Sequence, residues 1–220
     1  VIHAQLGHVQ ITAPDYFRSG LSEPYKHLLR GDPSIIASSE GAAVVTVAPR
    51  LAFTGIVSKG DMTISFLGEG VDPVAETPLN AGILLTAGGP LINRDEPTAF
   101  VGEGLAANID ARPGDLLVLM VTTATGGINA VEVRLAGTFA TPVKAYDDSV
   151  IRIPLEVARR LMRVEGATSW VVLLDNTDKT DQVVSSLRAR LPGGRYEIVP
   201  WYELADFYNK TAELFGRQVN

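Results

Sequence analysis

Runs of apolar and β-branched residues, separated by glycine or charged turns, dominate the middle of the chain. LLVLMVTT (116–123) and AVEVRLAGTF (130–139) lie on either side of Gly126-Gly127. Two such runs across a glycine turn predict a β-hairpin. The turn-like Lys59-Gly60-Asp61 separates two further runs in the same way. The remaining strands predicted in the first half are 7–12, 43–49, 51–57, 62–68, 81–86 and 98–102.

The last third of the chain alternates between strand and helix patterns. Strands are predicted at 149–153, 170–175 and 196–200, with a helix starting at Pro154 and another near Asp178. A final helix is predicted from Trp201, and its apolar positions continue at helical spacing without a stop signal. Its apolar stripe comprises Trp201, Leu204, Ala205, Tyr208, Ala212, Phe215 and Val219.

Two short helices are predicted nearer the start of the chain. The first is capped by Ser22 and carries Tyr25, Leu28 and Leu29, and the second follows the Asp32-Pro33 pair. Together these elements predict an α+β fold in two lobes. Both chain ends form one lobe with helices, and a β-rich lobe of roughly 59–140 is inserted between them.

Composition narrows the possible functions without indicating one. The 220 residues carry a formal net charge of -6 and contain no Lys/Arg cluster, which argues against a nucleic-acid partner. Cysteine is absent, so thiol catalysis, cysteine zinc sites and disulfides are excluded. There is no initiator Met, and no apolar run approaches the roughly 18–20 residues that span a bilayer. We therefore expect both ends to be boundaries within a longer protein.

The most suggestive chemical motif is a glycine pattern at Gly102-Glu103-Gly104-Leu105-Ala106-Ala107. In a dinucleotide-binding fold, such glycines let backbone amides approach a pyrophosphate at a helix start. That fold also needs a longer helix and a second parallel strand, whereas here Pro113 ends the helix and a hairpin follows. A turn followed by a short packing helix is the favoured interpretation.

The other candidate residues do not combine into a catalytic site. His3, His8 and His27 are expected at the surface or an interface rather than around a metal. The Asp147-Asp148 pair and Asp175 with Asp178 are interpreted as turn formers. Ser38-Ser39 and Ser185-Ser186 fall in helices and lack the turn of a serine nucleophile. The sequence therefore assigns no catalytic, cofactor-binding or metal-ligating residue, and we expect a protein that is not an enzyme.

From Phe100 to Phe215 the order of segments resembles the periplasmic core domain of MacB/FtsX-like ABC-transporter permeases, including the LolC/LolE lipoprotein-releasing type. The resemblance is carried by the segments 101–120, 131–162 and 170–193, and by the W-x-x-L helix from Trp201. The segments 7–17 and 47–73 are similar more loosely, with an "APR" followed by glycine and a "G-x-D-P". The LolC type holds its chaperone with a protruding loop. The candidate region for such a loop here is 86–98, whose sequence is not distinctive.

This resemblance implies a porter subdomain made of residues 1–58 and 141–220, and a sabre subdomain made of residues 59–140. It implies a location on the periplasmic face of the bacterial cytoplasmic membrane and a role in coupling ATP hydrolysis to movement of a lipoprotein, peptide or drug-like substrate. The implied partners are the protein's own transmembrane helices, a cytoplasmic ATPase subunit, a second permease subunit and a periplasmic adaptor or chaperone. A free-standing periplasmic module that binds a peptide or lipid is the alternative.

Overall fold

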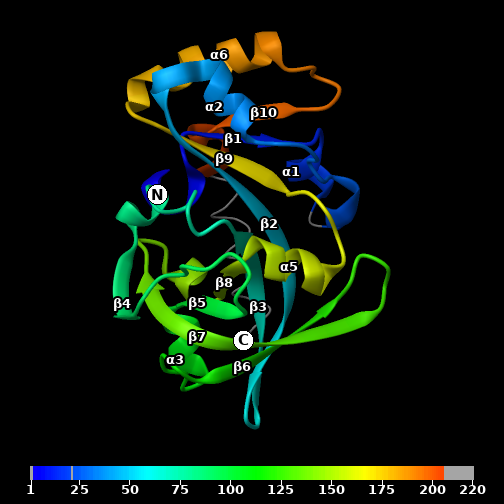
Figure 1. Cartoon of the computed structure of the whole chain (residues 1–220), viewed down its shortest axis with the longest axis vertical. Helices are drawn as coiled ribbons and strands as arrows, with labels where there is room; N and C mark the ends of the chain where they lie inside the picture. Colours follow the sequence, from blue (N-terminus) through cyan, green and yellow to red (C-terminus); the bar gives the residue numbers. More distant parts are fainter. Residues whose placement is uncertain (1, 21, 206–220) are drawn as a thin grey trace.

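One mixed sheet organises the chain in the computed structural model, which describes residues 2–20 and 22–205. The strand order is β10-β1-β9-β2-β3-β8-β5-β7-β4, and β6 pairs with both β2 and β7. The fold is therefore a mixed α and β structure, as predicted (Figure 1). The strands are β1 Val9–Thr12, β2 Val44–Lys59, β3 Met62–Val71, β4 Leu84–Gly88, β5 Thr98–Gly102, β6 Leu116–Thr122, β7 Ile128–Ala140, β8 Val150–Pro154, β9 Ser169–Leu174 and β10 Glu197–Pro200. The α-helices are α1 Tyr16–Ser19, α2 Ser34–Glu40, α3 Glu103–Asn108, α4 Lys144–Asp147, α5 Leu155–Met162 and α6 Thr180–Arg190.

The first part of the sheet is antiparallel and has both faces buried. It consists of β10, β1, β9 and the first half of β2. Helices α2 and α6 lie side by side over one face, at the top of Figure 1, where Ile36 packs with Val183 and Leu187. The opposite face contacts Leu79, which packs on Val171 and Leu173. Because β9 is covered on both sides, all its residues are buried, as its continuous apolar sequence predicts.

Strand β2 is shared by the two parts of the sheet. Its first half pairs with β9 and its second half pairs with β3 and β6. The separate strands predicted at 43–49 and 51–57 are therefore wrong, since a single strand continues through Pro49. Pairing with β3 begins only at Arg50, so Pro49 has a single neighbouring strand among those described, β9. On the other side no described strand is paired with it, so its missing N–H interrupts no hydrogen bond between strands there.

The second part of the sheet closes on itself. The pairings β2–β3, β3–β8, β8–β5, β5–β7, β7–β6 and β6–β2 form a ring. The predicted hairpin of β6 and β7 is confirmed, with Leu116 opposite Arg134 and Thr122 opposite Ile128. Strand β4 extends β7 outside the ring. Closure leaves most strands of this part with two neighbours, which removes exposed edges.

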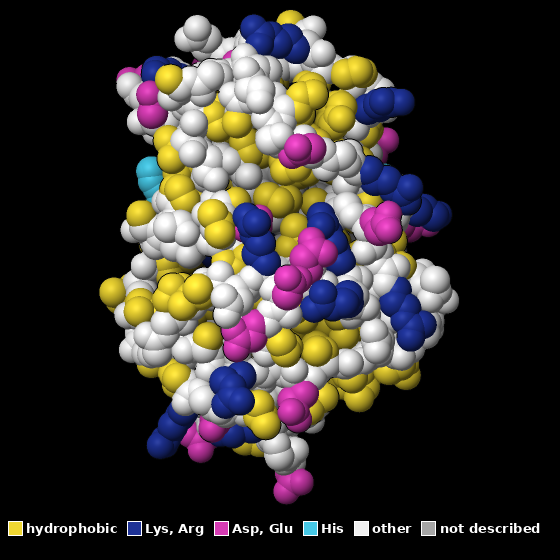
Figure 2. Space-filling model, viewed as in Figure 1, with side chains coloured by type: hydrophobic (Ala, Val, Ile, Leu, Met, Phe, Trp, Pro, Cys, Tyr) yellow, Lys and Arg dark blue, Asp and Glu magenta, His cyan; other side chains and the backbone are white. Residues whose placement is uncertain are grey.

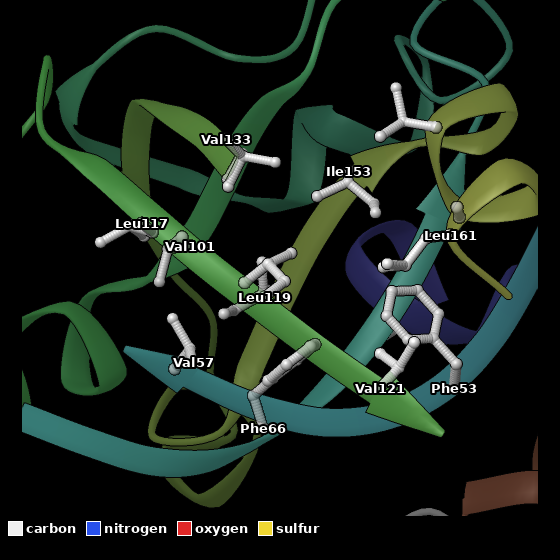
Figure 3. Close-up of a cluster of buried hydrophobic side chains, with 14 of the residues drawn as sticks. Phe53, Val57, Phe66, Val101, Leu117, Leu119, Val121, Val133, Ile153 and Leu161 are labelled. Atoms are coloured by element: carbon white, nitrogen blue, oxygen red, sulfur yellow. The ribbon is translucent and has the colours of Figure 1, made fainter. Parts of the chain in front are cut away.

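The ring encloses an apolar core drawn in Figure 3. Phe66 belongs to this core, has no exposed surface and meets Phe53 edge to face at 5.8 Å between ring centroids. Helix α5 closes one side and approaches β3 so closely that a Cβ at Gly70 would lie 2.5 Å from Ala158. Glycine at position 70 is therefore required for this contact.

The hydrophobic cores do not follow the boundaries that the resemblance implies. Leu51, Phe53 and Val57 share a core with β5, β6 and β7, and so do residues of β8 and α5. The division at 58/59 and 140/141 stays a prediction, but packing groups the flanking residues with the closed ring. The physical reason is that β2 and β8 are themselves members of the ring.

Two helix predictions need correction or fall partly outside the structure. The helix predicted after Ser22 is only a 3₁₀ turn at Pro24–Lys26, because Leu29 turns away to pair with Ala167. Helical structure begins at Trp201 as predicted and is described to Ala205, while the rest of that predicted helix lies outside the described residues. Within residues 2–20 and 22–205, no helix combines the length and hydropathy needed to cross a membrane.

Truncation of the buried Phe66 side chain tests the importance of the core inside the ring of strands. We expect Phe66→Ala to lower the free energy of unfolding by about 3–5 kcal/mol, because it removes a buried aromatic ring and leaves a cavity. Urea denaturation at unchanged m-value measures this change. The matched surface variant Ile128→Ala, at a side chain 75% exposed, should change the midpoint little. Equal effects of the two variants would contradict a packed ring interior.

Candidate functional site

The residues of the glycine motif lie at a helix–helix contact. Gly102 precedes α3, and a Cβ there would overlap the backbone carbonyl of Asp147. A Cβ at Gly104 would overlap the side chain of Asp148. Asp147 of α4 and the following Asp148 therefore occupy the space over these glycines, and the predicted short packing helix is present as α3, Glu103–Asn108.

The three histidines are not brought together around a metal. His3 and His8 are neighbours with ring centroids 5.9 Å apart, but His27 bonds to Pro14 and Ser19 elsewhere. Among the described residues, no group of three or more His, Cys, Asp or Glu side chains is placed to hold a metal ion. His27 is half-buried, and its hydrogen bonds account for its position.

His8 is buried, contrary to the predicted surface position. Its Nδ1 accepts a hydrogen bond from the backbone N–H of Leu174 at 2.9 Å, so the proton resides on Nε2, 3.0 Å from Thr177 Oγ1. Burial and the nearby His3 lower the pKa of His8, although Asp175 acts in the opposite direction. The neutral ring therefore connects the end of β9 to the start of β1.

The aspartate and serine candidates have structural partners. Asp147 accepts hydrogen bonds from the Thr141 N–H at 2.8 Å and its hydroxyl at 2.7 Å, and burial raises the pKa of this carboxyl. Asp148 pairs with Lys144, and Asp175 with Lys179. The hydroxyls of Ser38 and Ser39 bond to helix carbonyls, and Ser186 to Glu40. Asp178 contributes its backbone N–H to the Asn176 cap.

Sequence reasoning missed a chain of buried charged groups, which we call the ionic junction. Arg50 donates two hydrogen bonds to Glu76, at 2.6 Å from Nε to Oε1 and 2.9 Å from Nη2 to Oε2. Its third nitrogen, Nη1, donates to the Gln5 carbonyl at 2.5 Å. Arg50 and Glu76 are both buried, so this bidentate pair is shielded from water.

The second half of the ionic junction surrounds Arg152, whose side chain is only 1% exposed. Its Nε donates to Glu69 at 2.9 Å, its Nη2 donates to the Tyr146 hydroxyl at 3.0 Å, and its Nη1 lies 3.9 Å from Glu76. The Tyr146 hydroxyl in turn donates to both oxygens of Glu69 at 2.9 and 3.0 Å. The guanidinium also lies 5.5 Å from the centre of the Phe139 ring.

Charge pairing outweighs the cost of burial in the ionic junction. Burial opposes the ionised form of Glu76, but Arg50 and Arg152 hold the pKa of this carboxyl below its ordinary value. Burial, with the neighbouring Glu69 carboxylate, raises the pKa of Tyr146, so the phenol keeps its proton and donates it. Arg50, Glu76 and Arg152 therefore remain charged at neutral pH.

The ionic junction lies where the two parts of the sheet meet. Arg50 is the residue at which β2 passes from its pairing with β9 to its pairing with β3. Glu76 belongs to the segment between β3 and β4, which continues to Leu79 in the core beneath β9. Charged residues inside apolar strands, such as Arg50 in VAPRLAF and Arg152 in VIRIP, were the signal that could have indicated this site.

The two ends of the described chain meet at the far part of the sheet. Val9 pairs with Pro200 across β1 and β10, and the backbone N–H of Trp201 donates to the His8 carbonyl at 3.0 Å. Segments entering at residue 8 and leaving at residue 201 therefore lie next to each other.

Comparison with known proteins places the fold. No family model matches the chain, and no curated protein matches it in sequence. The periplasmic region of MacB from Actinobacillus actinomycetemcomitans superposes with a TM-score of 0.62 at 12% identity, covering 94% of both chains. The extracellular domain of the noncanonic ABC-type transporter YknZ from Gram-positive bacteria gives 0.58 at 9% identity, covering 88% of this chain and 100% of that one.

A permease-protein domain from Porphyromonas gingivalis is also similar, with a TM-score of 0.53 at 15% identity over 90% of each chain. The chain thus has the fold of extracytoplasmic domains found in ABC-transporter permeases. The MacB-like resemblance read from the sequence is confirmed at the level of the fold.

Breaking the ionic junction tests its role in stability. Glu76→Gln should lower the free energy of unfolding by about 3–5 kcal/mol, because it leaves the Arg50 guanidinium buried without its carboxylate. The double variant Arg50→Met/Glu76→Leu should be less destabilised than Glu76→Gln. The control Glu23→Gln removes an exposed pair with Lys26 and should leave the denaturation midpoint unchanged. A double variant worse than the single one would contradict this account.

The burial of His8 predicts a pH dependence of stability. Its pKa is lowered on folding, so its contribution is fully present above the ordinary value of 6.5 and is lost as the pH falls below that value. The thermal midpoint should therefore fall between pH 7.5 and pH 5. The variant His8→Asn keeps an acceptor for the Leu174 N–H but cannot titrate, so its midpoint should fall less. Identical pH profiles for the two proteins would refute the assignment.

Proposed function

We propose that this chain is the extracytoplasmic domain of an ABC-transporter permease and that it is not itself an enzyme. The domain lies on the outer face of the bacterial cytoplasmic membrane and couples cytoplasmic ATP hydrolysis to movement of a lipoprotein, peptide or drug-like substrate. The observation that carries the proposal is the similarity along nearly the whole chain to the periplasmic region of MacB, with TM-score 0.62 and 94% coverage.

The positions of the chain ends support the same proposal. Since the segments around His8 and Trp201 are hydrogen-bonded to each other, transmembrane helices that precede and follow the domain would stand side by side. Displacement of one helix relative to the other would then act directly on β1 and β10, which are paired strands. This arrangement suits a domain that receives mechanical work from the membrane.

The ionic junction would transmit such a displacement to the closed ring. Arg50 joins the Gln5 carbonyl, beside the incoming segment, to Glu76, and Glu76 lies near Arg152 in the ring. Strand β2 provides a continuous backbone link in parallel with these contacts. We propose that the two parts of the sheet move as connected bodies, with a second permease subunit, a cytoplasmic ATPase subunit and a periplasmic adaptor or chaperone as partners.

The absence of cysteine from the chain allows a sharp test of its location. The Ile92 side chain is 77% exposed, so Ile92→Cys in the full-length gene product should react with a membrane-impermeant maleimide in cells whose outer envelope has been permeabilised. Val172→Cys, at a fully buried position, is the control and should react only after denaturation. The labelled product should also sediment with the cytoplasmic membrane.

Two results would contradict the proposed location. Labelling of Ile92→Cys only after cell lysis would place the domain in the cytoplasm. Labelling from outside with recovery in the soluble fraction would instead support a free-standing periplasmic module that binds a peptide or lipid.

A further inference from the structure

An open groove lies beside the C-terminal end of α5, on the surface and separate from the ionic junction. The segment around Leu29 forms one wall, held by reciprocal backbone hydrogen bonds with Ala167 at 2.7 and 2.9 Å. The β6–β7 loop forms another wall, tied by a bond from the Ala124 N–H to the Met162 carbonyl at 3.2 Å. The volume of the groove is about 1010 Å³. Figure 2 shows Lys, Arg, Asp and Glu side chains gathered over this region.

Arginines outnumber carboxylates in this groove. Arg30, Arg159, Arg160 and Arg163 line it, against Glu156 and Glu165. Arg159 is engaged by Glu156 at 2.6 Å and by the Gly166 carbonyl at 2.9 Å, and Arg160 lies 3.7 Å from the exposed Asp95. Among the described residues, Arg30, Arg163 and Glu165 have no ion-pair partner, so two guanidinium groups and one carboxylate of the groove are unpaired on a chain whose net charge is -6.

Arg163 is also held in an uncommon backbone conformation. It ends α5 with φ 57° and ψ 48°, in the left-handed region. Glycine or asparagine is the usual residue at that position, and a residue such as arginine costs about 1–2 kcal/mol there. Arg163 therefore turns the chain at the end of α5, and its side chain lines the groove.

A second, apolar groove adjoins the first. It has a volume of about 530 Å³ and is lined mainly by apolar groups, among them Ile56, Met120 and Ile128 on the outer surface of the ring. Hydroxyl groups of Thr54, Ser65, Thr122 and Thr123 also line it. Tyr25 lines both grooves. Thr123 lines the apolar groove and the next residue, Ala124, lines the basic groove, so the two grooves are adjacent. Strand β6 also exposes Leu116 and Val118 on the same face as Met120. These side chains form an apolar row along the outer face of the strand.

We propose that the two grooves form one binding site for a single anionic amphiphile, meaning a molecule with a phosphate or similar anionic group and an acyl chain. Arg30 and Arg163 would bind the anionic group, and the acyl chain would lie along Ile56, Met120 and Ile128. A basic groove alone suits any anion, but its continuity with an apolar groove of about 530 Å³ favours a ligand with both parts. The claim that this ligand is the transported substrate rests on the proposed function. The claim that the chain binds such a ligand rests on the two grooves alone.

Titration calorimetry of the 220-residue chain tests the site without involving transport. The probe is lysophosphatidylglycerol, kept below its critical micelle concentration. Lysophosphatidylcholine has the same acyl chain and no net charge, and glycerol phosphate has the anionic group without the chain. We expect the anionic lysolipid to bind at least about tenfold more tightly than either comparison ligand, because only it engages both grooves. Equal binding of lysophosphatidylcholine would overturn the role of the arginines.

Matched variants locate the binding site. Arg30→Gln and Arg163→Gln should each weaken binding of lysophosphatidylglycerol by about tenfold, the loss of one charge-assisted contact. Arg195→Gln removes the same charge from an exposed position away from the groove and should bind like the unaltered chain.

The apolar groove is tested in the same way. Ile128→Ser should weaken binding, whereas Leu84→Ser on β4, at the side of the ring opposite α5 in Figure 1, should not. Circular dichroism spectra that match those of the unaltered chain establish that each variant is folded. If the three groove variants bind like the two control variants, or if glycerol phosphate or a polyglutamate peptide displaces the lysolipid at equal concentration, the amphiphile site is refuted.

Discussion

Two buried arginines impose the strictest requirement on this fold. A guanidinium that leaves water on folding costs several kcal/mol, and the cost is offset only where carboxylates and hydrogen bonds surround the charge. Arg50 and Arg152 meet this requirement through Glu69, Glu76 and the Tyr146 hydroxyl. These partners come from β3, from the segment that follows β3 and from α4, so several elements must reach their native positions together. The ionic junction therefore links the formation of the closed ring to that of the antiparallel part of the sheet.

Strand β2 provides the second link between these parts and explains why they are not independent units. Its first half completes the sheet beneath α2 and α6, and its second half is a member of the ring. A force applied at β1 or β10 reaches β2 through β9, by backbone hydrogen bonds that run across the sheet. The proposed role of the chain, as an extracytoplasmic permease domain that transmits movement, fits this continuous connection.

The functional surfaces lie outside both cores. The basic groove is assembled from the segment around Arg30, the end of α5 and the β6–β7 loop, which are distant in sequence. The apolar groove beside it uses side chains of the ring that point away from the packed interior, such as Met120 next to the buried Leu119. The ring thus stabilises the domain with one face of β6 and presents a binding surface with the other. This division is possible because successive residues of a strand point to opposite faces.

The sequence by itself determined the local elements and the general architecture. Alternation and glycine turns predicted β6 and β7, and helical spacing after Pro154 predicted α5, because these patterns depend on neighbouring residues only. The ordered segments were also enough to indicate the MacB-like fold. Tertiary structure decided the rest: Gly102 and Gly104 pack against Asp147 and Asp148, His8 is buried beside β9, and Arg50 pairs with Glu76. Charge partners and close contacts join residues tens of positions apart, so no local pattern contains them, and only the folded chain brings them within hydrogen-bonding distance.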